Sequence, residues 1–547
     1  MNADATFEKI IKETTDKVLE KNPHWATFIG LHDPYDNLLP DGSAKNVYAF
    51  LETLEEAYKK AKKTIKYDEL NAENQTDYKL LERTCEALRL LTHKRRAFEK
   101  DPDAFGEIGG VFFLMITRNY APLEKRIESM ATRIEKLPEF LKQFRTRFEK
   151  SKPVKLWTEI AIETCQQFPG LFQFVIVATK GRIPEDIHQH LVKAFTNVQQ
   201  PLKGHLEWLK ELLPKAEDNW AIGREMFEKL LQLRGLGMTS DEIYQLGVKY
   251  LNEMKEERAK LAKVIAPGKT IEEVMGEIRK DAPKTFEEAL EATRKEMENA
   301  RRFIIENDIA TVPEKDKLLV VETPAFMAPL IPFAALSPPA KYDASPQGIY
   351  IVTRPKDIKE LAKHINYWDI KNTAFHEAFP GHFLQMAESN KHSVARILAS
   401  SALLGVETVE GWAHYCEQMM VEHGYETDLR LRLIQVNDAI WRAVRIIVDV
   451  KLSRGEMKFD EAVEMLVKET GMPKDAAVAE VRRYTQTPSY ALSYLLGKHM
   501  ILALREDLRG KLGKRFSEKR FHDLIAENGH LPIYLLKPLI EQEMIKK

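Results

Sequence analysis

Two histidines and an adjacent glutamate are the residues of this sequence best suited to chemistry. His376, Glu377 and His382 lie in the string HEAFPGH. Imidazole nitrogens are common zinc ligands, and a catalytic zinc site usually takes three protein ligands. A glutamate beside the first histidine can take a proton from the water that the metal activates. The string therefore predicts a catalytic zinc site with His376 and His382 as ligands and Glu377 as general base.

The spacing of the two histidines requires a distorted helix. In the zinc motif HExxH the histidines are four residues apart and share one helix face. Here they are six apart, which places them about 240° apart around a regular helix. Pro380 removes a backbone donor and Gly381 accepts unusual dihedral angles. Without these two residues the string reads HEAFH, so we predict a distortion at Pro380-Gly381 on which the metal site depends.

A second segment, VEGWAHYCE, supplies candidates for a third ligand. Glu410, His414 and Glu417 are spaced i, i+4 and i+7, so they form one polar stripe on a helix that is otherwise apolar. Acids in such a helix should be paired or bound to metal. Glu410 follows His382 by 28 residues, enough for a helix, a turn and a return. We predict Glu410 as the third ligand and Glu417 as the group that orients a ligand imidazole, while His414 could serve in either role.

A third segment, residues 482–498, offers groups for the substrate. Tyr490 and Tyr494 are four residues apart on one predicted helix face, and either hydroxyl could donate to the oxyanion that forms on an attacked carbonyl. Arg482 or Arg483 could bind a peptide carboxylate. A tyrosine is more often a core aromatic residue, so the choice between the two tyrosines stays open here.

The elements that must position these residues are mostly helical. Residues 1 to about 305 follow the three- and four-residue spacing of consecutive amphipathic helices. Prolines and two short runs rich in β-branched residues, 318–321 and 348–353, then predict a small sheet. Helices resume at residue 357. We predict a mainly α protein with a helical lobe at 1–310, a β-sheet insertion at 311–355 and a helical catalytic lobe at 356–547.

Composition narrows the classes of partner. The chain has 547 residues, 44% hydrophobic and 30% charged, and a formal net charge of −1. The hydrophobic fraction is sufficient for a large core, and the chain has no excess of positive charge that would favour binding to nucleic acid. Three separated cysteines indicate reduced thiols. The N-terminal residues lack the apolar stretch of a signal peptide, and the most apolar long run, 318–336, contains three prolines. We expect a cytoplasmic protein without nucleic-acid or membrane partners, and leave its oligomeric state open.

The three segments together resemble a known family. HEAFPGH, EGWAHYCE and PSYALSYLLG are similar to the HExxPGH, EGWAxYxE and PxxAxSYxxG pattern of the family catalogued as domain of unknown function 885. Residues 26–33, 348–350 and 521–532 extend the resemblance over most of the chain. That family is similar in architecture to helical clamshell zinc peptidases, which include oligopeptidases, angiotensin-converting-enzyme-like enzymes and thermostable carboxypeptidases.

The resemblance implies a two-lobed helical clamshell with a small inserted sheet near the active-site cleft. It implies one zinc ion per chain, held by His376, His382 and Glu410, with Glu377 as general base. It also favours Tyr494 as the donor to the oxyanion, without excluding Tyr490.

Two further implications concern the surroundings of the metal. The strand around Gly348 and Tyr350 is implied to receive an extended substrate by pairing at a sheet edge. The family commonly has an aliphatic residue where His414 stands, so His414 is implied to be a local contact to a ligand or to the substrate.

We therefore expect zinc-dependent hydrolysis of peptide bonds in short peptides, of the oligopeptidase or carboxypeptidase type, because deep helical lobes would exclude folded proteins. Three alternatives remain at this stage. One is a zinc amide hydrolase that acts on a non-peptide substrate. The second is a metal-free helical protein that binds peptides in the same groove. The third is a helical scaffold with an accidental motif, which leaves the co-occurrence of three motifs unexplained.

Overall fold

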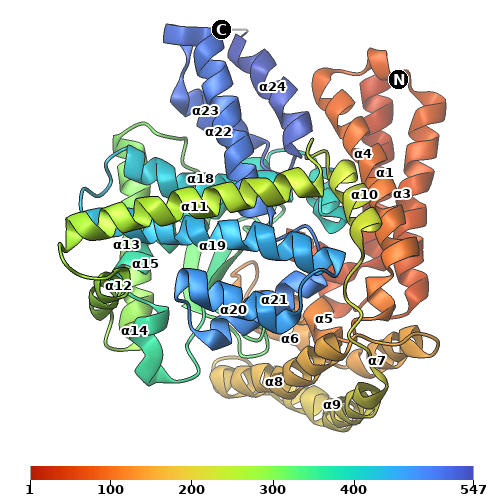
Figure 1. The fold of residues 1–547 in the computed structure, drawn as a ribbon. Coiled ribbons are helices and arrows are strands. Elements are labelled where there is room, and N and C mark those ends of the chain that lie inside the picture. The colour runs from red at the N-terminus through yellow and green to blue at the C-terminus, as the bar shows by residue number, and fades with distance from the viewer. Residues whose placement is uncertain (1, 546–547) are drawn as a thin grey trace. The chain divides into compact units, whose positions relative to one another are not determined.

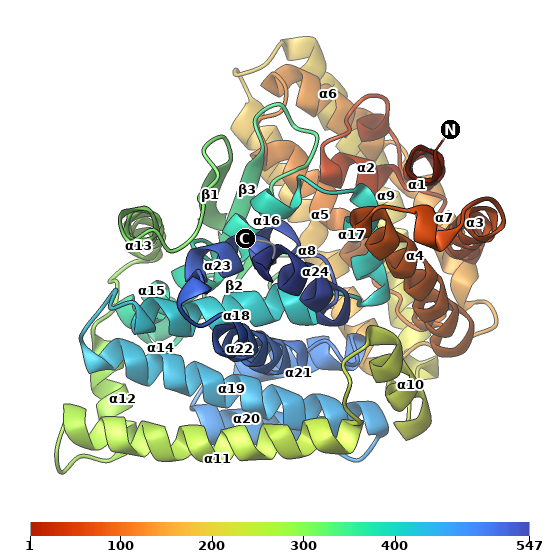
Figure 2. The same ribbon diagram turned by 90° about the horizontal axis from the view of Figure 1, so that it is seen from above.

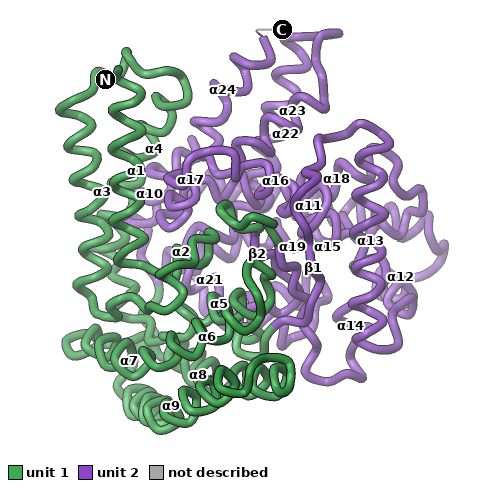
Figure 3. The backbone as a smooth tube through the Cα atoms, turned by 180° about the vertical axis from the view of Figure 1, so that it is seen from behind, with its two compact units in different colours: residues 1–220, 324–329, 339–347 green, residues 221–323, 330–338, 348–547 purple. Residues whose placement is uncertain are grey.

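The computed structural model describes residues 2–545, which are mainly helical with one small sheet (Figure 1). The prediction of a mainly α protein with a small sheet is confirmed. The chain forms two compact units, shown in different colours in Figure 3. Unit 1 comprises residues 1–220, 324–329 and 339–347, and unit 2 comprises residues 221–323, 330–338 and 348–547.

Unit 1 is a bundle of helices around an aromatic core. Phe105, Phe112 and Phe168 are at most 1% exposed, and the Phe168 ring contacts the rings of both others. Burial of such large apolar side chains is the main source of stability in a helical unit. Its helices are α1 (Ala3–Lys21), α2 (Pro23–Ile29), α3 (Ala44–Thr64), α4 (Ala72–Leu90), α5 (Ala104–Thr117), α6 (Leu123–Ile134), α7 (Leu137–Arg145), α8 (Lys155–Thr179) and α9 (Glu185–Leu212).

Helix α8 is the one helix of residues 2–545 that is long and apolar enough to cross a membrane by length and composition. Phe168, Phe172 and Val175 of this helix lie in the core of unit 1. A core helix has the same composition as a short membrane span, so the apolar character of α8 is weak evidence for insertion.

Unit 2 carries all three motifs. In Figures 1 and 2 its long helices α11 and α19 lie side by side. Its elements are α10 (Arg224–Arg234), α11 (Ser240–Ile265), α12 (Ile271–Lys280), α13 (Phe286–Glu306), β1 (Lys317–Glu322), β2 (Ala334–Ser337), β3 (Gln347–Val352), α14 (Leu361–His364), α15 (Tyr367–Glu377), α16 (His382–Ser389), α17 (Val394–Ala399), α18 (Val406–Glu422), α19 (Leu429–Arg454), α20 (Phe459–Thr470), α21 (Lys474–Gln486), α22 (Ser493–Leu512), α23 (Glu518–Glu527) and α24 (Ile533–Ile545).

These units divide the chain at other positions than the three predicted segments. Helices α10 to α13 belong to unit 2 with the motifs, and the predicted insertion at 311–355 is shared between the units. Helices α10 to α13 group with the motifs because α11 packs on α19, which is distant in sequence. A Cβ atom at Gly247 of α11 would lie 2.7 Å from Ile446 Cγ2 of α19, so glycine permits these two helices to pack closely.

The sheet has the strand order β1-β3-β2, so β3 is central. Strand β2 pairs antiparallel to β3, with Ala334 opposite Val352. β2 is short and partly buried, which is why its sequence did not stand out. Because a central strand has both edges occupied, the expected edge pairing of substrate with Gly348 and Tyr350 is wrong. The outer strands of the sheet are β1 and β2.

Helices α18 and α22 cross at two glycines. A Cβ atom at Gly497 would lie 1.9 Å from Glu407 O, and one at Gly411 would lie 2.4 Å from Gly497 C. The backbones therefore meet without intervening side chains. Glu410 precedes the first glycine and Tyr494 is about one turn before the second, so the crossing places the acidic motif beside the tyrosine motif.

Candidate metal centre

The helix that carries the first motif is interrupted between its two histidines. Helix α15 ends at Glu377 and α16 begins at His382. Ala378 (φ −105°, ψ −92°) and Gly381 (φ −69°, ψ −134°) both depart from helical geometry. The predicted distortion is confirmed, and it takes the form of a complete break that allows the second histidine to turn back toward the first.

Two contacts require the residue types found in this break. A Cβ atom at Gly381 would lie 1.9 Å from His376 O, so no larger residue fits there. The Trp412 indole donates a hydrogen bond to Pro380 O at 2.9 Å, which ties the break to α18. The EGWA motif thus supports the HEAFPGH motif directly.

The break brings three candidate ligands together. His376, His382 and Glu410 are each at most 8% exposed, and one ligand atom of each lies within 4.8 Å of the others. Glu410 Oε2 lies 3.2 Å from His382 Nε2 and 3.7 Å from His376 Nε2. Ligands about 2.0–2.1 Å from a tetrahedral zinc ion are separated by about 3.3 Å. Two imidazole nitrogens and one carboxylate oxygen at these spacings fit zinc.

The charges of the cluster are mutually dependent. Burial opposes ionisation of Glu410, but His382 and His376 hold the pKa of its carboxyl well below the usual range. Burial alone would lower the pKa of His376, but the Glu410 and Glu417 carboxylates outweigh it and raise the pKa to about 9. At neutral pH, His376 of the metal-free protein is therefore a charged imidazolium, which carries a proton on both ring nitrogens.

Zinc binding should consequently release a proton. Below pH 9 the metal must displace the proton of His376, whose pKa is about 9, so affinity should rise about tenfold per pH unit from 7 to 8 and level off above 9. Calorimetric titration of zinc at pH 7, in buffers with different ionisation enthalpies, should give about one proton released per metal ion. A pH-independent affinity and no proton release would contradict this assignment.

Glu417 holds the first candidate ligand, His376, by a hydrogen bond. The Nδ1–H of His376 donates to Glu417 Oε1 at 2.8 Å, which leaves Nε2 for the metal. Glu417 is 0% exposed and also accepts hydrogen bonds from Arg442 Nη2 at 3.3 Å and Asn372 Nδ2 at 3.1 Å. His414 Nδ1 lies 3.1 Å from Glu417 Oε2. The predicted residues Glu417 and His414 therefore lie behind the ligand His376.

His414 is placed there as a neutral imidazole. Burial lowers its pKa to about 3, with a further contribution from Lys498 and in spite of Glu417. A neutral ring that faces an ionised carboxylate must carry its proton on Nδ1. Since His376, His382 and Glu410 satisfy the spacing of a metal site without it, His414 belongs to the support of Glu417.

Replacement of Glu417 by Gln should weaken zinc binding about 10- to 100-fold, the usual effect of removing a group that orients a ligand. The amide lacks the charge that holds the His376 ring in its ligand orientation. Competition with a chromogenic chelator measures the affinity. Glu422→Gln is the matched control because Glu422 lies on the same helix, is 40% exposed and pairs with Arg505. Equal affinities of the two variants would show that Glu417 has no such role.

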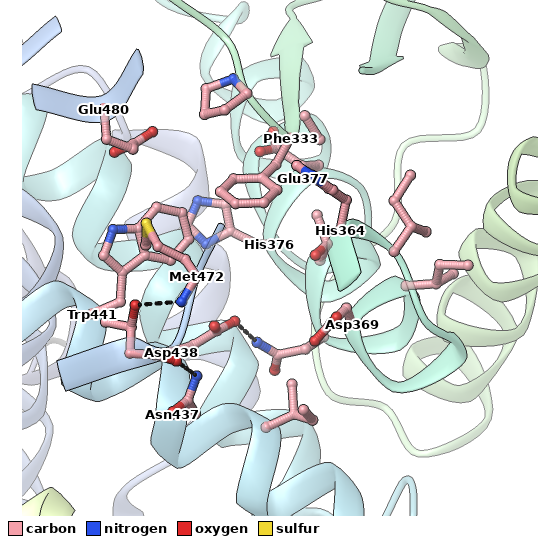
Figure 4. A pocket seen from close by; sticks show the side chains of 18 of the residues that line it. Phe333, His364, Asp369, His376, Glu377, Asn437, Asp438, Trp441, Met472 and Glu480 are labelled. Carbon is pink, nitrogen blue, oxygen red and sulfur yellow. Dashed lines mark hydrogen bonds between the residues drawn. The ribbon is translucent and has the colours of Figure 1, made fainter. Parts of the chain in front are cut away.

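A cavity of about 380 Å³ within unit 2 adjoins the metal cluster. His376 and Glu377 line it, and Figure 4 shows both side chains at the pocket. Glu377 is 7% exposed, and its Oε2 atom is buried without a hydrogen-bond partner in the part of the chain that the structure describes. A buried carboxylate oxygen without a donor is suited to accept a proton from a bound molecule.

The prediction that the two candidate tyrosines share one helix face is wrong, because Tyr490 lies in the turn between α21 and α22 and only Tyr494 lies in α22. The Tyr490 hydroxyl donates to Glu410 Oε1 at 2.5 Å, so it supports a metal ligand. Tyr494 lines the cavity, and its ring lies 6.0 Å from that of His376. Burial, with Glu410 nearby, raises the pKa of Tyr494 to about 12, so the hydroxyl keeps its proton for donation.

The turn before Tyr494 is held by an acid that sequence reasoning missed. Asp449 is 0% exposed and accepts hydrogen bonds from the backbone N–H groups of Ser489 and Leu492, both at 2.9 Å. Ser489 has a φ of 68°, which a non-glycine residue adopts only under such constraint. Asp449 thereby holds the backbone of the turn on either side of Tyr490.

The two predicted arginines also differ in whether they line the cavity. Arg483 lines the cavity, whereas Arg482 is not among the residues at its wall. A further cation, Arg445, was missed. It stacks between Trp441 and Tyr494, 4.1 and 4.2 Å from the ring centroids, and also lines the cavity. The sequence signal that could have identified Arg445 is its charge within an apolar run of α19, because a charge in such a run needs a partner.

Of the two predicted substrate residues of β3, only one lines the cavity. Tyr350 lines the cavity, and burial with the nearby Glu377 raises the pKa of its hydroxyl well above the usual range. Gly348 does not line it. A Cβ atom at Gly348 would lie 2.8 Å from the Phe383 ring, so this glycine permits close packing of β3 on α16.

These features define a mainly helical protein with a buried His-His-Glu centre beside a cavity. The chain belongs to the family described as "Bacterial protein of unknown function (DUF885)", whose pattern matches residues 23–540. No curated protein matches the sequence.

Two solved structures share the fold. A protein from Shewanella oneidensis, described as a candidate lipoprotein of unknown function, is 23% identical with a TM-score of 0.75, over 98% of this chain and 99% of its own. A candidate lipoprotein from Colwellia psychrerythraea is 18% identical with a TM-score of 0.83, over 100% of both chains. At these identities the likeness concerns the fold alone.

Proposed function

We propose that this protein is a zinc-dependent peptidase that hydrolyses peptide bonds in short peptides. One observation carries the proposal. Three buried ligand atoms within 4.8 Å of one another adjoin a cavity into which a carboxylate, Glu377, brings an oxygen without a partner among residues 2–545. The HEAFPGH string, which reads as an interrupted HExxH zinc motif, supports the same reading.

The residues have distinct roles in this proposal. His376, His382 and Glu410 would hold the metal, which supplies a Lewis acid for a carbonyl oxygen and acidifies water. Glu377 takes the proton from the attacking water and passes it to the leaving amine. Tyr494 donates a hydrogen bond to the oxyanion, and its position at the cavity wall favours it over Tyr490.

The cations at the cavity wall favour action near a chain end. Arg445 and Arg483 both line the cavity and are both paired with Glu480, at 2.6 and 3.4 Å. Two cations share one acid, so one positive charge remains for a carboxylate such as a peptide C-terminus. As an outer strand of the sheet, β2 is the proposed partner for an extended substrate backbone, since Ala334 and Ala335 line the same cavity.

Conversion of Tyr494 to Phe should lower kcat about 100-fold with unchanged zinc content, because one oxyanion donor is lost. Conversion of Tyr490 to Phe should mainly weaken zinc binding, because Glu410 loses a hydrogen bond at 2.5 Å. Kinetics and metal analysis of both variants separate the roles. An equal kcat for Tyr494→Phe and the wild type would remove Tyr494 from the reaction.

The function is tested by incubating the zinc-loaded protein with a library of short peptides and identifying new termini by mass spectrometry. New termini that require zinc and Glu377 would support the proposal, and their positions would distinguish carboxypeptidase from oligopeptidase action. Binding without cleavage would favour a peptide-binding protein. Zinc binding without cleavage of any peptide would favour an amide hydrolase that acts on another substrate.

A further inference from the structure

The cavity continues along one face of α15, away from the metal cluster. Asp369, Asn372 and His376 all line it, and they are spaced i, i+3 and i+7 on this helix. Seven residues of α-helix rise about 10 Å. The far end of the cavity therefore lies about three peptide units from the metal cluster, at about 3.3 Å per extended residue.

Two carboxylates face this far end. Asp369 of α15 and Asp438 of α19 both line the cavity, and Figure 4 shows both on the side of the pocket opposite Phe333. Burial and Asp438 raise the pKa of Asp369 to about 7 in spite of Arg279. Burial also raises the pKa of Asp438, although Arg442 opposes the shift. Without a ligand the ionised forms of both carboxyls are therefore disfavoured, and a bound cation would stabilise them.

The nearby cations have other partners. Arg279 Nη2 donates to Gly471 O at 3.1 Å. Arg442 lies 3.5 Å from Asp438 Oδ2, but it also binds Glu417 at 3.3 Å. The shortest hydrogen bond to Asp438 comes from the neutral amide of Asn372, at 2.7 Å. Asp438 therefore shares its one cation, Arg442, with Glu417, and within residues 2–545 Asp369 forms no ion pair with a lysine or arginine.

An independent feature indicates a missing donor at the same place. Asn372 is 1% exposed and lines the cavity. Its Nδ2 donates to both Asp438 and Glu417, whereas its Oδ1 is buried and accepts no hydrogen bond from residues 2–545. A buried acceptor without a donor is costly unless a ligand supplies one.

We propose that this end of the cavity binds a cationic group of the peptide substrate, an ammonium or a guanidinium, through Asp369, Asp438 and Asn372. Such a group brings several N–H donors and a positive charge, which are what the three side chains lack. The inference rests on the proposed peptidase function and specifies its substrate class. The cation is either a basic side chain close to the scissile bond or an α-ammonium about three residues before it, as the length of the cavity requires.

The first part of the test varies the peptide, with wild-type protein for turnover and an inactive variant for binding. Short peptides that differ only by lysine against norleucine, or arginine against citrulline, are compared by kcat/KM, and by calorimetric binding to the zinc-loaded Glu377→Gln variant. The cationic peptide should be favoured at least about tenfold in both measurements. N-acetylation of the same peptides separates the sources: loss of the preference identifies the α-ammonium, and its retention identifies the side chain. Equal values for both members of every pair, free and acetylated, overturn the inference.

The protein side of the test uses Asp438→Asn and Asp369→Asn. Each should reduce the preference for the cationic peptide over its neutral partner to less than about threefold. Asp460→Asn is the matched control, because Asp460 is exposed on α20 and does not line the cavity. Circular dichroism and zinc content verify each variant, and a preference that survives in a folded, zinc-loaded Asp438→Asn variant overturns the assignment.

The outcomes also separate this inference from the function on which it rests. Preferential binding of the cationic peptides without cleavage by the wild type would support the cation site and refute the peptidase. Cleavage without any charge preference would support the peptidase and refute the cation site.

Discussion

The wild-type protein, purified without chelator, is expected to contain about one zinc ion per chain, and His382→Ala almost none. Three protein ligands are the usual number for a catalytic zinc site, so loss of one removes most of the affinity. The cluster is also tightly spaced, since His382 Nε2 lies 3.2 Å from Glu410 Oε2. Plasma mass spectrometry of the purified proteins measures the metal content.

His93→Ala is the matched control for this experiment, because His93 is exposed on unit 1 and lies outside the cluster. It should retain the wild-type metal content. A wild-type protein that contains no metal and takes up none when zinc is added would contradict the proposed centre. The buried His-His-Glu cluster would then be a polar network of a peptide-binding protein.

The second large effect is expected for Glu377→Gln, which should lower turnover by about 10²–10⁴-fold while the zinc content stays at the wild-type level. The amide has nearly the same shape but cannot take the proton of the attacking water. Zinc should remain because Glu377 is not one of the three clustered ligands. Turnover is measured with the best peptide from the library, and metal content by plasma mass spectrometry.

Glu422→Gln again serves as control, since this exposed acid of α18 is expected to leave turnover unchanged. Full activity of a zinc-loaded Glu377→Gln variant would require a different general base. Loss of zinc together with activity would instead place Glu377 in the support of the metal, and the role of its unpaired oxygen would have to be assigned anew.

The local parts of the site could be predicted from the sequence because they depend on spacing along the chain. The interval between His376 and His382 required a break at Pro380-Gly381, and the structure has one there. The stripe of Glu410 and Glu417 followed from helix periodicity alone. In each case neighbouring residues and backbone geometry are sufficient to determine which side chains share a face.

Other parts depended on contacts between distant segments. Tyr490 and Tyr494 are four residues apart, which is a helical spacing, but Tyr490 lies in the turn before α22. Only the tertiary structure shows that Tyr490 bonds to Glu410 and that Tyr494 lines the cavity. The strand containing Tyr350 could be predicted, but its central place in the sheet depends on β2, which is too short to be recognised alone.

The sequence by itself therefore determined the mainly helical class, the broken metal motif and the stripe of acids that follows it. Only the tertiary structure decided how the helices are grouped, which tyrosine lines the cavity, and that Asp369 and Asp438 both line its far end. The physical reason is that periodicity encodes which residues share a face, whereas the partner of that face is chosen by long-range packing, such as the close approach of α18 and α22 at Gly411 and Gly497.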